Sequence, residues 1–136
     1  METLMFIGKV NSDLKTLEQC PLLEHENAPP ATIEIFGEFA QGIKDIIPGD
    51  RLILFTWLHQ ADRAVLITRP RNNLNAPLTG VFSTRSPDRP NPIGIHIVKV
   101  TSVLHDNRFV VEGLEVLDQT PIVDLKPYLN SPFQGV

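Results

Sequence analysis

Cysteine is almost absent from this sequence, which holds one in 136 residues. A single cysteine, Cys20, cannot form an internal disulfide, and this excludes the disulfide-rich secreted domains. The apolar runs are far shorter than the about 20 residues that a membrane-spanning helix needs, and the N-terminus has no signal-peptide pattern. These absences predict a cytoplasmic protein without a membrane partner.

Other kinds of site are also missing from the pattern. The four histidines are scattered and share no metal-ligand spacing with the cysteine, so we expect no metal site. No glycine-rich loop of the dinucleotide type is present, which excludes a Rossmann-type interpretation. The net charge of −4 argues against a large nucleic-acid surface, because the basic residues cluster only within 63–71 and 85–89.

Short apolar runs bounded by turn residues dominate what is present. The length and the hydrophobic fraction of 42% predict one globular domain over residues 1–136. Many short strands without alternating helices predict a mainly β fold, a small closed antiparallel β-barrel with one short helix. Residues 38–47 have helical spacing and would cover or plug the barrel. We expect strands at 4–10, 31–36, 51–59, 64–68 (as the hairpin partner of 51–59), 93–103, 109–117 and 122–125.

Residues 51–59 are apolar on both alternating faces of the expected strand. A small barrel can bury only one of these faces internally, so the other predicts contact with a second copy in a homodimer. The two faces are Leu52, Leu54 and Leu58 against Ile53, Phe55 and Trp57.

Residues 80–94, GVFSTRSPDRPNPIG, form a proline-rich stretch that carries several polar donors. Its prolines fix φ and restrict the preceding residues, so little conformational entropy remains to be lost on binding. Arg85, Arg89 and Asn91 could then converge on a polar or anionic ligand. An exposed loop with merely solvated arginines is the alternative interpretation.

This stretch resembles a signature of the TrmO (TsaA-like) family, and residues 117–128, LDQTPIVDLKPY, resemble the second signature of that family. Weaker similarity surrounds Ile7, Gly8 and residues 55–59. The resemblance implies a small β-barrel that pairs into a dimer. It also implies an S-adenosylmethionine-dependent tRNA methyltransferase that modifies N6 of threonylcarbamoyl-adenosine next to the anticodon.

Cofactor-binding positions also follow from the resemblance. The family's Pro-Arg-Gln element, in the expected loop or arm 14–30, is replaced here by Leu17-Glu18-Gln19, and its usual Leu-Asp-Gly-Thr-Pro has glutamine at position 119. If that glycine needs a positive φ, Gln119 is strained or the turn differs. The implied cofactor-binding residues are Glu18, Gln19, His59, Gln60, Arg85, Ile95, Asp118, Gln119, Thr120 and Pro121.

The methyl acceptor implied by the resemblance must lose a proton, which calls for a base within hydrogen-bond reach. Asp124, Asp118 and His59 are the candidates, and the sequence does not choose among them. Asp124 could equally form a surface ion pair with Lys126. Arg89 and Asn91 are candidates for substrate contact, or they could rigidify the proline-rich stretch.

Two further functions compete with the enzyme. One is a non-catalytic barrel that binds S-adenosylmethionine or a nucleotide and regulates a partner. The replaced Pro-Arg-Gln element and Gln119 would favour this function. The other is a barrel that binds RNA alone, and it is weakened because no aromatics are interleaved on a basic face.

Overall fold

The computed structural model describes residues 1–15, 29–70 and 73–129. These residues form β-strands and two 3₁₀ helices, joined by turns. The helices are η2 (Gly37–Ile43) and η4 (Val81–Ser83). The strands are β1 (Gly8–Asn11), β2 (Ala31–Ile35), β3 (Arg51–Trp57), β4 (Ile67–Thr68), β5 (Thr79–Gly80), β6 (Ile93–Val103), β7 (Arg108–Glu112) and β8 (Pro121–Pro127).

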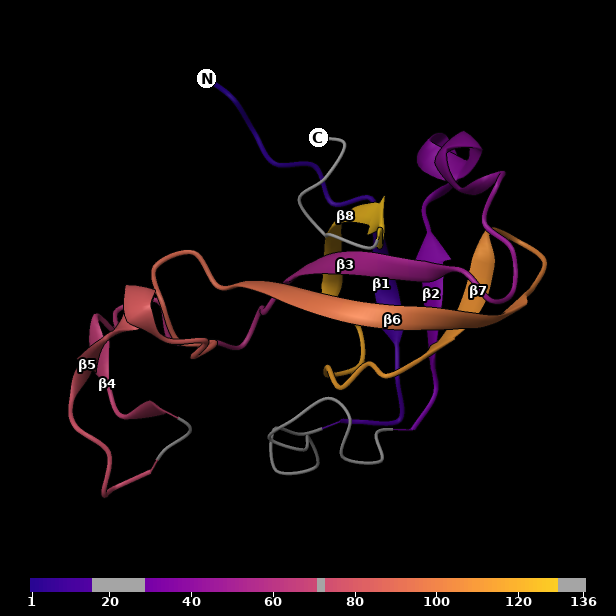
Figure 1. The fold of residues 1–136 in the computed structure, drawn as a ribbon. Coiled ribbons are helices and arrows are strands. Elements are labelled where there is room, and N and C mark those ends of the chain that lie inside the picture. The colour runs from indigo at the N-terminus through magenta and orange to yellow at the C-terminus, as the bar shows by residue number, and fades with distance from the viewer. Residues whose placement is uncertain (16–28, 71–72, 130–136) are drawn as a thin grey trace.

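Six strands close into a barrel in the order β1-β2-β7-β6-β3-β8 (Figure 1). Each neighbouring pair is antiparallel, and the pairing of Gly8 with Ile122 joins β1 to β8 and completes the ring. Closure leaves these apolar strands without an open edge. The predicted fold class, a small closed antiparallel barrel with a short helix, is confirmed.

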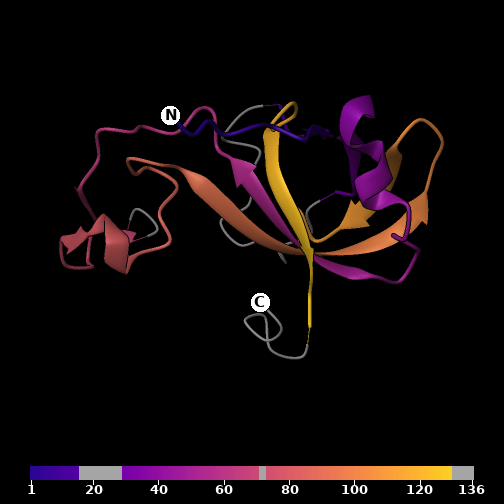
Figure 2. The same cartoon turned by 90° about the horizontal axis from the view of Figure 1, so that it is seen from above.

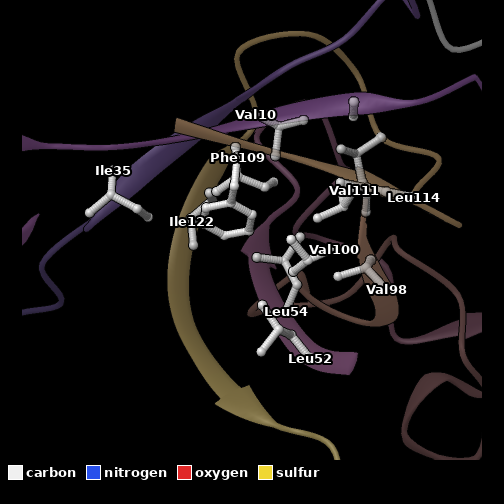
Figure 3. Packing of buried hydrophobic residues seen from close by; sticks show 13 residues of the cluster. Val10, Ile35, Leu52, Leu54, Val98, Val100, Phe109, Val111, Leu114 and Ile122 are labelled. Atoms are coloured by element: carbon white, nitrogen blue, oxygen red, sulfur yellow. The ribbon is translucent and has the colours of Figure 1, made fainter. Parts of the chain in front are cut away.

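The barrel interior is filled by side chains that alternate along the strands. In β6 every second residue from Gly94 to Val100 is buried, while the residues between them are exposed. The packed cluster, seen in Figure 3, includes Leu54, Val98, Phe109 and Ile122. Antiparallel barrels require strands in which buried and exposed side chains alternate, so that one face lines the interior and the other faces solvent.

Helix η2 lies at one end of the barrel (Figure 1). Phe39, Ile43 and Ile46 pack against the core from this side, as the helical spacing predicts. The element is a 3₁₀ helix and is shorter than the expected 38–47. Gly37 and Gly42 lie within it, and glycine disfavours a longer regular helix.

The expected hairpin between 51–59 and 64–68 is wrong. Strand β3 pairs with β6 on one side and β8 on the other, so neither of its edges is available to a third strand. Ile67 and Thr68 instead form β4, which pairs with β5.

Residues 66–70 and 73–83, which include strands β4 and β5 and helix η4, form an arm. In Figures 1 and 2 the arm lies to one side of the barrel. Its large apolar side chains are exposed, and they are Leu66, Ile67, Leu74, Leu78 and Phe82.

Candidate functional site

Arg89 organises the first half of the proline-rich stretch from within. Its Nε donates to the carbonyl oxygen of Ser86 at 2.7 Å, and its Nη2 donates to that of Val81 at 2.7 Å and to that of Thr84. Prolines remove backbone N–H groups, and a guanidinium with several N–H groups adds donors for the carbonyls of such a loop. These contacts are the ones expected if Arg89 rigidifies the stretch, the alternative that the sequence leaves open.

The second half of the stretch is held from outside by the turn that follows β3. The backbone N–H of Asp62 donates to Asp88 Oδ1 at 2.9 Å. Arg63 donates from Nε to the Pro90 carbonyl at 2.6 Å and from Nη2 to Asn91 Oδ1 at 3.1 Å. Sequence reasoning missed Arg63, since its only signal was membership of a basic cluster. Asn91 uses its side-chain oxygen in this contact.

Arg85 lies in the first half of the stretch, between Thr84 and Ser86, whose backbone carbonyls accept hydrogen bonds from Arg89. Its side chain is exposed, and it makes no hydrogen bond or ion pair with the described residues. His59 and Gln60 are exposed in the turn directly after β3, which also carries Arg63. A cation on a braced loop, without an internal partner, is available to an anionic ligand group.

A second group of predicted residues lies on the outer face of the barrel. Phe55 of β3 pairs with Ile95 of β6 on one side and with Asp124 of β8 on the other. Directly paired residues share a face, so the three side chains form one row across the sheet. Asp124 also contacts Lys126, with 3.5 Å between carboxylate and ammonium, so the surface ion pair is observed too.

The third group is the turn before β8, which is bound to β1 and the residues after it. Asp118 accepts from the Ser12 backbone N–H at 2.8 Å and lies 2.8 Å from Lys15 Nζ. The Lys15 contact, with the Ser12 hydrogen bond, lowers the pKa of Asp118 from 3.8 to about 2. Such a carboxyl stays ionised and is a weak proton acceptor.

Two neighbours complete the turn. Gln119 has φ +69°, the left-handed conformation that the usual glycine would adopt freely, and its side chain donates to Asn11 at 2.9 Å. Thr120 is buried and donates to the Leu117 carbonyl at 2.7 Å, while Pro121 begins β8.

The predicted residues thus form three groups within one chain, and two more lie outside the described residues. Glu18 and Gln19 are the latter. Within the described residues, no hydrogen bond joins the proline-rich stretch to the Asp118 turn. A shallow cavity lined by Glu34, Phe36 and Asp106 contains none of the predicted residues.

Two further features of the described ranges bear on function. No cluster of three or more histidine, cysteine or acidic side chains there could hold a metal ion. No helix in the same ranges is long and apolar enough to cross a membrane.

Curated relatives match most of the chain. A probable S-adenosyl-L-methionine-binding protein, VirR, of Rhizobium radiobacter is 38% identical over 125 residues, covering 92% of this chain and 70% of the relative. A second, from Methanocaldococcus jannaschii, is 38% identical over 105 residues, covering 74% of this chain and 82% of the relative.

Solved structures show the same barrel. A crystal structure of TrmO superposes over the whole chain with a TM-score of 0.73 and 26% identity. TrmO from Pseudomonas aeruginosa gives a TM-score of 0.70 at 24% identity, a likeness of fold. The chain spans 61% and 59% of these two solved chains.

The family model described as the tRNA-methyltransferase O N-terminal domain matches residues 9–132, from the first strand of the barrel through both signatures. With the barrel closed as expected and relatives matched over nine-tenths of its length, this chain belongs to the TrmO family.

Proposed function

We propose that this chain binds S-adenosylmethionine and transfers its methyl group to N6 of threonylcarbamoyl-adenosine in tRNA. The observation that carries the binding step is Arg85, an exposed cation without a partner among the described residues, on a loop braced by Arg89 and Arg63. Family membership and relatives named as S-adenosyl-L-methionine-binding proteins support the choice of ligand.

The donor set fits such a ligand. A guanidinium at Arg85 matches a carboxylate in charge and geometry. The exposed face of Ile95 and Phe55 offers an apolar surface, and the Asp118 turn offers main-chain groups and an ionised carboxylate. When bound, S-adenosylmethionine supplies an electrophilic methyl group on a sulfonium. The chain's task is then to orient the reactants and exclude water.

Asp124 is the proposed base. It lies in the same row as Ile95 and has nearly half of its side chain exposed, so a proton can reach it from an acceptor on this face. Asp118 is less suited because its pKa is held near 2 by Lys15 and Ser12. His59 is the alternative if the acceptor lies closer to the turn after β3, which contacts the proline-rich stretch. A ureido N–H is more acidic than an aromatic amine, so a weak base suffices.

A second copy of the chain would bring the separated groups together. Among the described residues, no hydrogen bond joins the proline-rich stretch to the outer row or to the Asp118 turn. The outer face carries a stripe of three isoleucines that are 43–45% exposed, Ile93, Ile95 and Ile97, and the arm also exposes large apolar side chains. We propose a homodimer in which these surfaces are covered, with tRNA as the substrate.

Calorimetric titration with S-adenosylmethionine tests the binding step. Arg85→Ala should lose about 1.5–3 kcal/mol of binding free energy, the range for hydrogen bonds to a charged group. The matched control is Arg69→Ala, which removes another exposed arginine beside β4 and should leave the affinity unchanged. Equal affinity of Arg85→Ala and wild type would remove Arg85 from the site.

Methyl transfer is tested with methyl-tritiated S-adenosylmethionine and two tRNA preparations, from a strain that makes the threonylcarbamoyl modification and from one that cannot. Label should enter only the first and should map to the modified adenosine after nuclease digestion. Asp124→Asn should lower the rate while leaving cofactor affinity near wild type. Cofactor binding without label in either tRNA would identify a non-catalytic binding barrel instead.

A further inference from the structure

Arg63 joins the end of β3 to the proline-rich stretch through three contacts. Its Nε lies 2.6 Å from the Pro90 carbonyl oxygen, and its Nη2 lies 3.1 Å from Asn91 Oδ1. The same guanidinium stacks over the Trp57 ring, with its central carbon 5.0 Å from the ring centroid. One side chain therefore contacts both the barrel and the loop that carries Arg85.

The second half of the stretch, which Arg89 does not hold, receives such outside donors because its own backbone offers few. Pro87, Pro90 and Pro92 have no backbone N–H, so this part of the chain cannot form a regular hydrogen-bonded ladder. The last backbone bond of the β3–β6 side is donated by Leu58 to the Pro92 carbonyl at 2.8 Å. Beyond that bond, the Asp62 backbone and the Arg63 guanidinium supply the donors that reach the stretch.

The Trp57 ring is a fixed surface on which the Arg63 guanidinium stacks. Trp57 is the last residue of β3 and pairs with Ile93 in the ladder, and its ring lies 6.3 Å from that of Phe6. A planar guanidinium stacks flat on the indole and donates two hydrogen bonds from its edge, whereas a lysine ammonium has no planar fork with which to reproduce that geometry. The geometry is thus specific for arginine rather than for a positive charge.

We propose that Arg63 is a positioning residue for the Arg85 site, which holds the proline-rich stretch at the angle that ligand binding requires. The inference rests on the proposed binding of S-adenosylmethionine. Arg63 itself does not touch the ligand in this proposal. It acts by lowering the number of conformations that residues 84–91 sample before binding, so less entropy is lost when the ligand binds.

The test compares Arg63→Gln and Arg63→Lys with Arg51→Gln. Arg51 is a matched control, because it also stacks on an aromatic ring, that of Tyr128 at 4.7 Å, but from the opposite end of β3. Both Arg63 variants should bind S-adenosylmethionine about three- to tenfold more weakly, since exposure reduces the contribution of charged hydrogen bonds. Arg51→Gln should bind like wild type.

Trp57 reports on the contact directly, because it is the only tryptophan in the sequence. Loss of the stacked guanidinium exposes the indole to water, so Arg63→Gln should shift the tryptophan emission to longer wavelength and Arg51→Gln should not. Backbone amide exchange at residues 84–91 should be faster in both Arg63 variants, while exchange in the barrel strands stays unchanged. That pattern separates positioning from a general loss of stability.

Each result then decides between the two proposals. Unchanged affinity in Arg63→Gln, alongside binding by wild type, overturns the positioning role. Lysine restoring full affinity also overturns it, because charge alone would then suffice. If wild type does not bind S-adenosylmethionine, the proposed function fails. The exchange rates at 84–91 then still test whether Arg63 holds the stretch, and equal rates in variant and wild type refute that.

Discussion

Gln119 occupies a backbone conformation that residues with a Cβ rarely adopt, and this locates a strained point beside the proposed site. Its φ of +69° is in the left-handed region. Gln119→Ala and Gln119→Gly both remove the side-chain bond to Asn11, so their difference isolates the backbone cost. We expect the glycine variant to be more stable than the alanine variant by about 1 kcal/mol. Urea denaturation measures this, and equal midpoints would show that the turn relaxes around any residue.

Asp118 should make stability depend on acid pH. Its pKa falls from 3.8 to about 2 because Lys15 and the Ser12 amide stabilise the carboxylate. A lowered pKa in the folded state contributes stability above pH 3.8, and that stability is lost as the pH falls toward 2. Asp118→Asn should therefore be less stable than wild type at pH 6, and the gap should narrow at low pH. A constant gap in urea midpoints across this range would contradict the assignment.

Single residues also mark where sequence reasoning stops. The motif identifies Arg85 and Arg89 alike, since both are arginines four positions apart in the same stretch. Only the fold separates them, because Arg89 turns inward to three carbonyls and Arg85 does not. Arg63 lies outside both signatures and reaches the stretch from 27 and 28 residues away in sequence. No local pattern encodes such a contact.

At the scale of elements, β3 and β6 fit together closely where the proline-rich stretch enters the barrel. A Cβ added to Gly94 would lie 2.5 Å from Thr56 Oγ1 and 2.6 Å from His96 Nε2. Thr56 and His96 are buried and hydrogen-bonded to each other at 2.8 Å, so neither can move without breaking that contact. The last glycine of the stretch is therefore explained by steric packing.

Gly94→Ala should lower the free energy of unfolding by about 1–3 kcal/mol, the usual cost of overpacking. The control is Gly37→Ala in η2, where no heavy atom lies within 4 Å of the added Cβ and little change is expected. Thermal and urea unfolding give both values. If the two substitutions cost the same, the fit between β3 and β6 is looser than the structure indicates.

Elements with clear alternation were predictable, and those defined by remote pairing were not. The run 93–103 matches β6 at both ends because β-branched residues, which favour strands, recur along its whole length. The run 109–117 continues apolar after β7 ends at Glu112, since Leu114 and Val116 are buried in the core without belonging to a strand. The partner of β4 depended on which edges of β3 were already occupied, and local sequence does not contain that information.

At the scale of the whole molecule, the net negative charge bears on binding to tRNA, and the exposed apolar surface bears on contact with a second copy of the chain. The net charge of −4 leaves few cations for a polyanion, so affinity for tRNA should be low and should fall steeply with salt. Meanwhile the isoleucine stripe lies directly beside Phe55, on a face that a single barrel leaves open to water. Apolar area of this kind on a closed barrel is typical of a subunit contact.

Ile97→Glu tests whether that contact exists and whether it completes the site. Ile97 is 43% exposed on β6 opposite Ile53, so a carboxylate there would be buried against a second copy and should prevent pairing. We expect light scattering to give a dimer mass for wild type and a monomer mass for Ile97→Glu. Thr101→Glu, an exposed position four residues further along β6, should remain dimeric.

The monomeric variant retains Arg85, Asp124 and the Asp118 turn, so its affinity for S-adenosylmethionine should fall only if two copies build the site. A monomeric wild type at micromolar concentration, or full affinity in the monomeric variant, would place the whole site within one chain.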